Sequence, residues 1–312
     1  MGRAERAQRT REPPRTGSPT TQISQASVVR MFGTTTYDFR ERVALIAGAS
    51  RGIGAEAARV FAQAGAAVVI TARSAEPLAG VADEIEGAGG TALSQPGDLT
   101  DADFVRDLVD ETIGRFGRLD AAFNNAAGGT MPAPLAELDV ADFDGAIAGN
   151  IRATFLGCKY QIPAMLKSGG GAIVNMASVA GVIGTANLAA YTAGKAGIIA
   201  LTKVAALDYA DAGVRVNVVA PGPILTHHLE RAGSYAQQQA AKSVPMGRTG
   251  TVAEVAATVL WLCSDASSFI TGAVIPLDGG QTAGYKPPQM YRPGEQMRPA
   301  DDADGSATNQ AS

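Results

Sequence analysis

The segment VALIAGASRGIG, residues 43–54, decides the fold, because it reads as a buried strand, a glycine-rich turn and the start of a helix. The run VALIA is continuously apolar, as expected for a parallel strand covered on both faces. Gly48, Gly52 and Gly54 permit a tight turn and let backbone N–H groups approach a phosphate at the helix N-terminus. The spacing is G-x-x-x-G-x-G, and its position directly after the first strand indicates a dinucleotide site.

Apolar runs and Ala-rich segments alternate along the rest of the chain. Further strands are expected at 66–71, 91–95, 119–125, 171–178, 214–221 and 272–280. Helices are expected near 52–64, 75–88, 101–116, 140–167, 189–211, 226–241 and 251–263. This alternation predicts an α/β fold with a doubly wound parallel sheet (a Rossmann fold) in a single domain, residues 38–283. The ligands of such a sheet bind beyond the carboxyl ends of its strands.

The two ends of the chain differ from this pattern. Residues 1–37 are rich in Arg, Pro, Ser and Thr without a hydrophobic period, so we expect a disordered N-terminal extension. Met31 is an alternative start of translation within that segment. Residues 284–312 are Pro-rich and polar, and we expect a mostly irregular C-terminal tail.

Composition excludes several classes of function. The 312 residues carry a formal net charge of −4, which gives no support for nucleic-acid binding. No apolar run reaches the roughly 20 residues that a membrane span requires. Two cysteines and two histidines provide no zinc-ligand spacing and no disulfide framework. We therefore expect a cytoplasmic protein with a small-molecule partner, no nucleic-acid or membrane partner and no metal.

The end of the second strand, VVITARS, bears on the choice of cofactor. Ala72 stands where a carboxylate would bind the 2′-hydroxyl of NAD, and Arg73 follows it. Arg51 in the glycine turn adds a second guanidinium, a group suited to a 2′-phosphate. The prediction is that NADP(H) is preferred and NAD(H) is possible. The alternative is that both arginines are ordinary surface residues.

The stretch AAYTAGKAG, residues 189–197, places Tyr191 four residues before Lys195. That spacing puts both side chains on one face of a helix. An adjacent positive charge lowers the pKa of a phenol and prepares the tyrosine for general acid/base chemistry. The alternative is an ordinary helix with a packed tyrosine and a solvated lysine.

Over roughly residues 40–283 the chain resembles the classical branch of the short-chain dehydrogenase/reductase family. The motifs that carry the resemblance are AGASRGIG (47–54), Asp98, NNAAG (124–128), Asn150, Ser178, YTAGK (191–195) and APGPILT (220–226). Two positions depart from the family pattern: Ala47 replaces a threonine, and Ala127 replaces a glycine. The second change affects a loop beside the nicotinamide, since alanine tolerates fewer backbone conformations than glycine.

The resemblance implies roles for four catalytic residues. Tyr191 is the general acid in carbonyl reduction and the base in alcohol oxidation. Lys195 is its electrostatic partner and binds the nicotinamide ribose. Ser178 holds the substrate carbonyl, and Asn150 positions a water in a proton relay behind the lysine.

The glycine turn and the resemblance together give a set of expected cofactor contacts. These are Gly48, Ser50, Arg51, Gly52, Ile53, Gly54, Arg73, Asp98, Leu99, Asn124, Ala126, Tyr191, Lys195, Pro221, Gly222, Ile224 and Thr226. Within this set, Asp98 is expected at the adenine, and Asn124 and Ala126 present backbone to the riboses. Ile224 offers its backbone to the carboxamide. Thr226 has an alternative role as the N-cap of the following helix.

Segments 181–190 and 223–247 are expected to border the substrate, the second as a lid. Neither holds a fixed cation cluster, so a strongly anionic small substrate is not expected. His227 and His228 are interpreted as exposed lid residues and not as catalysts.

The predicted function is an NAD(P)-dependent oxidoreductase that transfers hydride between the nicotinamide and a ketone or secondary alcohol. One alternative is a 3-oxoacyl-[acyl-carrier-protein] reductase, which predicts a basic patch near the pocket mouth for its acidic carrier. Another is a catalytically silent dinucleotide-binding regulator. The resemblance implies a homotetramer or homodimer.

Overall fold

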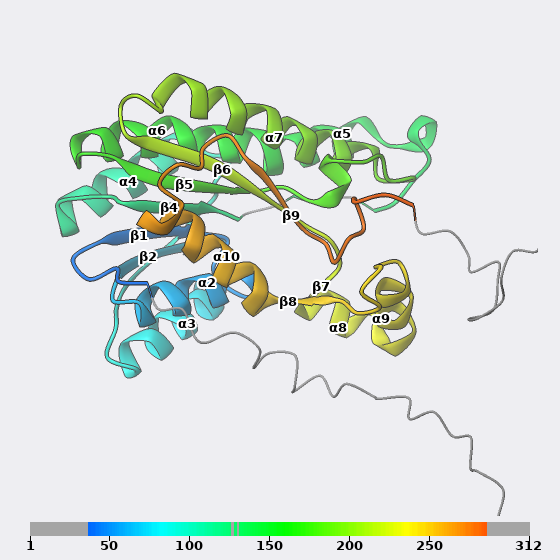
Figure 1. The fold of residues 1–312 in the computed structure, drawn as a ribbon, viewed down its shortest axis with the longest axis horizontal. Coiled ribbons are helices and arrows are strands. Elements are labelled where there is room, and N and C mark those ends of the chain that lie inside the picture. Colours follow the sequence, from blue (N-terminus) through cyan, green and yellow to red (C-terminus); the bar gives the residue numbers. More distant parts are fainter. Residues whose placement is uncertain (1–36, 126–127, 130, 286–312) are drawn as a thin grey trace, which may run out of the picture. The chain divides into compact units, whose positions relative to one another are not determined.

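The computed structural model describes residues 37–125, 128–129 and 131–285. Nearly all of the expected N-terminal extension and C-terminal tail, together with Ala126, lie outside these residues. One sheet of seven parallel strands runs through the domain in the order β3-β2-β1-β4-β5-β6-β9 (Figure 1). The strands are β1 (Val43–Ala47), β2 (Ala67–Ala72), β3 (Thr91–Pro96), β4 (Ala121–Asn124), β5 (Gly171–Met176), β6 (Val214–Pro221) and β9 (Val274–Leu277). The order reverses between β1 and β4, which is where a doubly wound sheet opens a crevice for its ligand.

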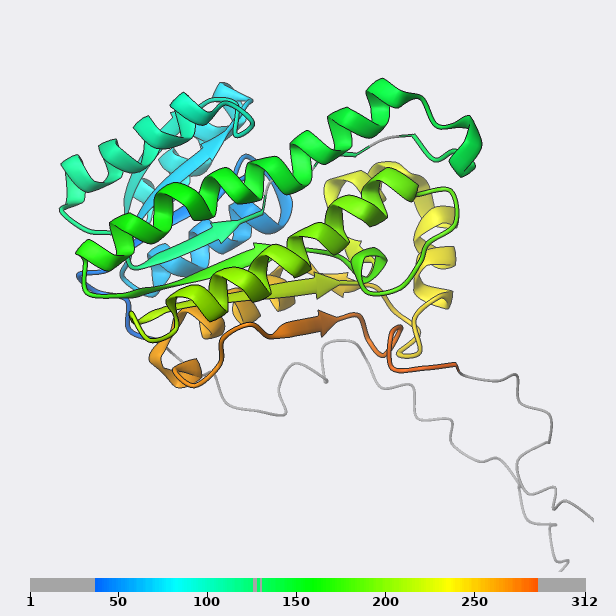
Figure 2. The same cartoon turned by 90° about the horizontal axis from the view of Figure 1, so that it is seen from above.

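Helices cover both faces of the sheet (Figures 1 and 2). On one face lie α2 (Gly52–Gln63), α3 (Ala75–Gly87) and α10 (Val252–Cys263). On the other lie α4 (Ala102–Phe116), α6 (Ala153–Lys167) and α7 (Ala189–Tyr209). The remaining elements are η1 (Leu135–Glu137), α5 (Val140–Ile147), η2 (Ala148–Arg152), η3 (Val179–Gly181), β7 (Ile224–Leu225), α8 (His227–Arg231), α9 (Gly233–Lys242), β8 (Gly250–Thr251) and η4 (Asp265–Ser267).

The core explains why the first strand reads as an unbroken apolar run. Ala44 and Ile46 point into the cluster beneath α2 and α10. Val43 and Leu45 point the opposite way, into the cluster beneath α4 and α6. Each strand residue is therefore buried on one face or the other, and a fully buried aliphatic side chain contributes about 1.5–3 kcal/mol. No helix within the described part of the chain has the length and apolarity needed to cross a bilayer.

The predicted doubly wound fold is confirmed, and two elements differ from expectation. The helix expected over 140–167 is interrupted by η2, a π-helical turn centred on Asn150. Asn150 Nδ2 donates to the Ala146 carbonyl at 2.8 Å, so a side chain takes an acceptor that helical backbone would use. The segment expected to be helical over 226–241 forms two helices, α8 and α9. The break lies at Gly233, whose φ of 86° is in the left-handed region.

Candidate active site

The glycine turn between β1 and α2 is a tightly packed backbone turn at the end of the first strand. Gly48 and Gly52 have φ values of 69° and 57°, which favour glycine. A Cβ at Gly54 would lie 2.2 Å from the Gly48 carbonyl oxygen, so this position admits no side chain. Arg51 is the N-cap of α2 and makes no side-chain capping bond, which leaves the first N–H groups of the helix for an anion.

A first cavity of about 620 Å³ extends from this turn toward β2 and β3. Its lining includes Ser50, Arg51, Arg73, Asp98 and Leu99, all predicted cofactor contacts. The Thr100 backbone N–H and hydroxyl both donate to Asp98 at 2.9 Å. These bonds, and then the charge of Arg73, lower the pKa of Asp98 below its usual value. The first cavity thus offers two guanidiniums and a fixed carboxylate.

A second cavity of about 750 Å³ meets the first at the glycine turn. The two cavities share Gly48, Arg51, Asn125 and Gly129. Predicted site residues lining the second cavity are Gly48, Arg51, Gly52, Ile53, Ser178, Tyr191, Lys195, Pro221, Gly222, Ile224 and Thr226. The structure therefore brings together segments separated by more than a hundred residues of sequence.

Ser178 and Tyr191 form the polar end of the second cavity. Ser178 is the extended N-cap of η3, and its hydroxyl accepts the Ala180 N–H at 3.2 Å. Burial raises the pKa of the Tyr191 phenol, and a hydrogen-bonding interaction with Ser178 opposes that shift. The expected lowering by Lys195 is therefore not the direction found in this structure. The physical reason is that the desolvation of the phenol outweighs the favourable contributions.

Lys195 is 1% exposed and lies beneath Tyr191 on the same face of α7. Its Nζ donates to the Met176 carbonyl at 2.8 Å and lies 5.6 Å from the centre of the Tyr191 ring. Burial lowers the pKa of Lys195 to about 7, since no carboxylate compensates for the lost hydration. An ammonium has three N–H donors, and within the described residues the Met176 carbonyl is the one acceptor recorded for Lys195. The remaining donors suit the hydroxyl groups of a ribose.

Asn150 is fully buried in the π-turn next to α7. Its Nδ2 donates to the carbonyls of Gly128 and Ala146 at 2.7 and 2.8 Å. Its Oδ1 is buried and receives no hydrogen bond from the described residues. A Cβ at Gly194 would lie 3.0 Å from the Asn150 Cβ, so Gly194 lets α7 pack directly on this side chain. Asn150 thus holds one acceptor ready for a water or a ligand hydroxyl.

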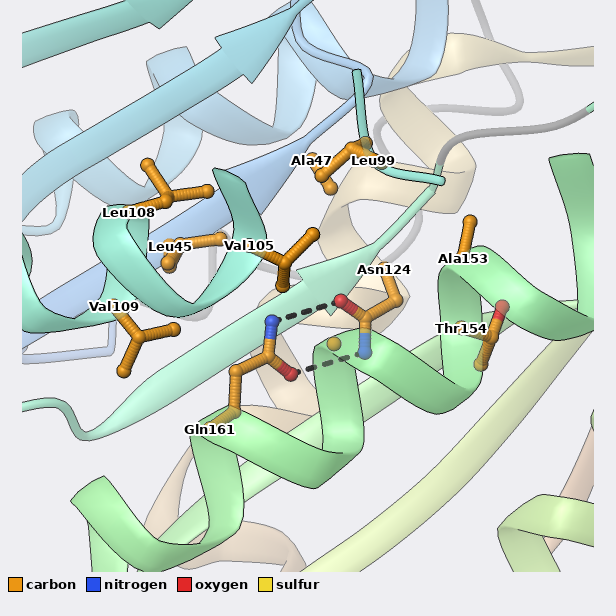
Figure 3. Close-up of a pocket in the computed structure, with 11 residues that line it drawn as sticks. Leu45, Ala47, Leu99, Val105, Leu108, Val109, Asn124, Ala153, Thr154 and Gln161 are labelled. Carbon is orange, nitrogen blue, oxygen red and sulfur yellow. Dashed lines mark hydrogen bonds between the residues drawn. The ribbon is translucent and has the colours of Figure 1, made fainter. Parts of the chain in front are cut away.

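Asn124 belongs to a buried amide network and not to the lining of either large cavity. Asn124 and Gln161 exchange two hydrogen bonds, of 3.0 and 2.9 Å, which Figure 3 shows beside a small apolar cavity. Asn124 Nδ2 also donates to Asn175 Oδ1 at 2.9 Å. A Cβ at Gly157 would lie 2.7 Å from Asn124 Oδ1, so the pair needs that glycine. This network fixes the end of β4 against α6 and β5.

The remaining predicted site residues have separate outcomes. Gly54 lies under the glycine turn as a packing residue, and Ala126 lies outside the described residues. Thr226 stands at the N-cap position of α8 but makes no capping bond with its side chain, and it lines the second cavity. Asn125 was not predicted; it lines both cavities and donates to the Gly48 carbonyl at 3.1 Å. Its signal in the sequence was the second asparagine of NNAAG.

The predicted substrate segments contribute unequally to the second cavity. His227, His228 and Leu229 of α8 and Ala240 of α9 line it. Val182 and Ile183 lie exposed on the surface instead, and Tyr235 is 75% exposed outside the lining. The described residues contain no group of three His, Cys, Asp or Glu side chains that could hold a metal.

The chain matches known proteins over this same region. A family model described as enoyl-(acyl carrier protein) reductase matches residues 48–282. The chain is 41% identical to an A-factor type gamma-butyrolactone 1′-reductase of Streptomyces virginiae, over 78% of this chain and 96% of that one. It is 42% identical to a cis-4-hydroxycyclohexanecarboxylate dehydrogenase of Sinomonas cyclohexanicum, over 78% and 98% of the two chains.

Two further matches place these in a wider group. A 3-oxoacyl-[acyl-carrier-protein] reductase of Thermotoga maritima is 39% identical, over 77% of this chain and 97% of that one. A crystal structure of a short-chain type dehydrogenase/reductase from Mycobacterium marinum superposes with a TM-score of 0.75 and 36% identity. That match covers 79% of this chain and 98% of the other.

Proposed function

The chain belongs to the classical short-chain dehydrogenase/reductase family, and from that premise we propose an NADP(H)-preferring reductase of ketones and dehydrogenase of secondary alcohols. It is an oxidoreductase acting on CH–OH and C=O groups, as its relatives are. One observation carries the proposal further. Ser178, Tyr191 and Lys195 line one cavity, and that cavity opens onto the glycine turn.

The residues present fit a dinucleotide. Gly48, Gly52 and Gly54 leave the turn free of side chains where a pyrophosphate would meet the N–H groups of α2. The Lys195 donors that bind no described residue fit the nicotinamide ribose. The cofactor supplies or accepts the hydride, and the protein supplies binding, orientation and electrostatics.

The proton step is assigned to Tyr191. During reduction, negative charge develops on the carbonyl oxygen, and the hydroxyls of Ser178 and Tyr191 are placed to stabilise it. Because burial raises the pKa of Tyr191, the phenol is protonated at neutral pH and can donate its proton to that oxygen. Lys195 then supports the phenolate, and Asn150 Oδ1 positions a water that returns the proton.

The preference for NADP(H) is proposed from charge in the first cavity. Arg51 and Arg73 both line it, at the end of β2 where the adenosine ribose is expected. A carboxylate at Ala72 would have favoured NAD, and alanine leaves that position neutral. Guanidiniums pair with phosphate in a bidentate manner, so the two arginines favour a 2′-phosphate.

We propose a small ring ketone or ring alcohol as the substrate class, since the Sinomonas relative is named for a hydroxycyclohexane compound. The alternative of an acyl-carrier-protein substrate predicts a basic patch near the cavity. The charged side chains of the nearby segment 131–147 are Glu137, Asp139, Asp142 and Asp144, all acidic. Because like charges repel, an acidic carrier is not expected to dock on this segment, whereas α8 and α9 beside the second cavity carry the basic Arg231 and Lys242.

We also propose a homodimer or homotetramer built on α6 and α7, which lie side by side (Figure 2). Leu207 and Val204 of α7 are 82% and 56% exposed, and Phe155 of α6 is 48% exposed. An apolar face of this kind is typical of an interaction surface. A reducing cytoplasm stays the proposed location, because Cys158 and Cys263 are both buried free thiols.

A panel of ring and chain ketones with NADPH, and the matching alcohols with NADP⁺, tests this function by absorbance of the reduced cofactor. We expect turnover of ring ketones and a lower KM for NADPH than for NADH. Binding of NADPH without turnover of any compound in the panel would instead support the silent regulator.

A further inference from the structure

Five of the described residues that line the second cavity have ionisable side chains. They are Arg51, Tyr191, Lys195, His227 and His228. Among the described residues, no aspartate or glutamate lines this cavity. The proposed function already uses three of the five: Arg51 for the cofactor, and Tyr191 and Lys195 for the proton step. The two adjacent imidazoles are left without a role.

His227 and His228 are the first two residues of the short helix α8, and both are exposed. Before them, β7 pairs with β8 through Ile224 and Gly250. Within α8, Glu230 N–H donates to the Thr226 carbonyl at 2.9 Å, and Ala232 N–H donates to the His228 carbonyl at 3.2 Å.

A second helix fixes α8 from outside. Gln237 Nε2 of α9 donates to the carbonyls of Leu229 and Glu230, at 3.4 and 3.3 Å. The imidazoles therefore project from an anchored helical turn, and such anchoring reduces the ordering cost of binding.

The chemistry of the cavity suits an acidic group on the substrate. An imidazole donates a hydrogen bond from one ring nitrogen when neutral and from both when charged. Hydrogen bonds to an ionised acceptor are roughly twice as strong as neutral ones. Because no aspartate or glutamate among the described residues lines this wall, an anionic group entering near α8 meets imidazole donors and no protein carboxylate there.

We propose that His227 and His228 form a recognition site for a carboxylate on the substrate, remote from the carbonyl that is reduced. This proposal rests on the proposed function and narrows its substrate class to oxo acids and hydroxy acids. It replaces the expectation from sequence that a strongly anionic substrate is not indicated. That expectation rested on the absence of a cation cluster in segments 181–190 and 223–247, whereas the cavity gathers basic groups from the glycine turn, α7 and α8.

The test compares 4-oxocyclohexanecarboxylate with its methyl ester, which has the same ring and ketone but no charge. The ratio of their kcat/KM values with NADPH is measured for the wild type, His227→Leu, His228→Leu and the double variant. Tyr235→Phe is the control, because Tyr235 is exposed on the same lid but does not line the cavity. We expect the wild type and Tyr235→Phe to favour the carboxylate by about tenfold or more.

In the double variant we expect the ratio of the two kcat/KM values to fall to about one, and a loss of rate common to both compounds cancels in that ratio. An equal or better ester in the wild type overturns the proposal, and so does a preference that survives the double substitution. If the wild type reduces neither compound, the binding of non-reducible analogues is measured by calorimetry in the presence of NADP⁺. There, cyclohexanecarboxylate must bind tighter than its methyl ester, and the double variant must lose the difference.

These measurements distinguish failure of the proposed function from failure of the carboxylate-recognition proposal. Absence of any ketone turnover removes the proposed function, whereas turnover without selection for the carboxylate removes only the role of the histidines.

Discussion

Lys195 shows most clearly what a single residue contributes to this site. An ammonium that is 1% exposed and bound to one carbonyl is costly, and its pKa falls to about 7 as a result. Burial also raises the pKa of Tyr191, and the hydrogen bond with Ser178 opposes that shift. Functional sites commonly accept such costs for the sake of a tuned group.

The buried lysine predicts how stability changes with pH. Its folded pKa of about 7 lies below the value of 10.5 for an exposed lysine, so the unfolded chain binds more protons between these pH values. Stability therefore rises with pH across that interval, by about 2 kcal/mol from pH 7 to pH 9. Urea unfolding at both pH values should show this rise in the wild type and its absence in Lys195→Met. Equal slopes in the two proteins would mean that Lys195 keeps an ordinary pKa.

Arg73 provides the residue-level test of cofactor choice. Removal of one guanidinium from the ribose phosphate costs a charge-assisted hydrogen bond, so Arg73→Ala should raise the KM for NADPH about tenfold. The KM for NADH should change little, because NADH lacks the phosphate. A parallel loss for both cofactors would assign Arg73 to folding or to general cofactor binding instead.

At the residue scale, the sequence predicted that several polar side chains come together, and their catalytic roles stay predictions. Ser178, Tyr191 and Lys195 are polar groups in small-residue surroundings, and the structure places them in one cavity. The backbone of Asn124 is predicted to lie near the riboses, and the sequence gives no indication that its side chain binds Gln161 and Asn175. That binding depends on where α6 lies in space, and no local pattern encodes it.

At the scale of elements, the turn from β1 into α2 is the most constrained junction. Gly54→Ala would bring a Cβ to 2.2 Å from the Gly48 carbonyl oxygen, which is backbone and cannot move aside cheaply. We expect a loss of about 1–3 kcal/mol of stability together with weaker NADPH binding.

Gly80→Ala in α3 is the matched control, because nothing lies within 4 Å of its Cβ. Alanine in a helix interior stabilises relative to glycine by about 0.5–1 kcal/mol, so the control should unfold at a slightly higher denaturant concentration. Similar effects from both substitutions would show that the turn is not tightly closed.

The residues at which most helices and strands begin and end can be predicted from the periodicity of the apolar residues and from the positions of the glycines, because both are local signals in the sequence. The π-turn at Ala148–Arg152 does not, because it depends on the Asn150 side chain reaching the Ala146 and Gly128 carbonyls. Gly128 lies more than twenty residues away in sequence, so this contact exists only after the strands are assembled.

At the scale of the whole molecule, the alternation of strands and helices was sufficient to predict the doubly wound sheet. Chirality and short connections leave few ways to arrange such units, which is why a single sequence specified the topology. The way in which subunits assemble is harder to predict from sequence, because exposed apolar residues indicate an interaction surface but do not identify the partner that covers it.

Leu207→Glu tests the proposed assembly through α7. A carboxylate in the middle of an apolar interface would be buried at high cost, so the variant should sediment as a smaller species than the wild type. Leu135→Glu is the control, since Leu135 is similarly exposed but lies on η1. If both variants retain the wild-type mass, the α7 face is not the interface.

The central claim is that Tyr191 transfers the proton in a nicotinamide-dependent reaction, and Tyr191→Phe tests it most directly. Phenylalanine keeps the ring and removes only the hydroxyl, so NADPH affinity measured by fluorescence titration should stay within about twofold. With saturating ketone, kcat should fall by roughly 10²–10⁴, the usual contribution of a general acid. A variant that binds NADPH and reduces the ketone at the wild-type rate would contradict the account.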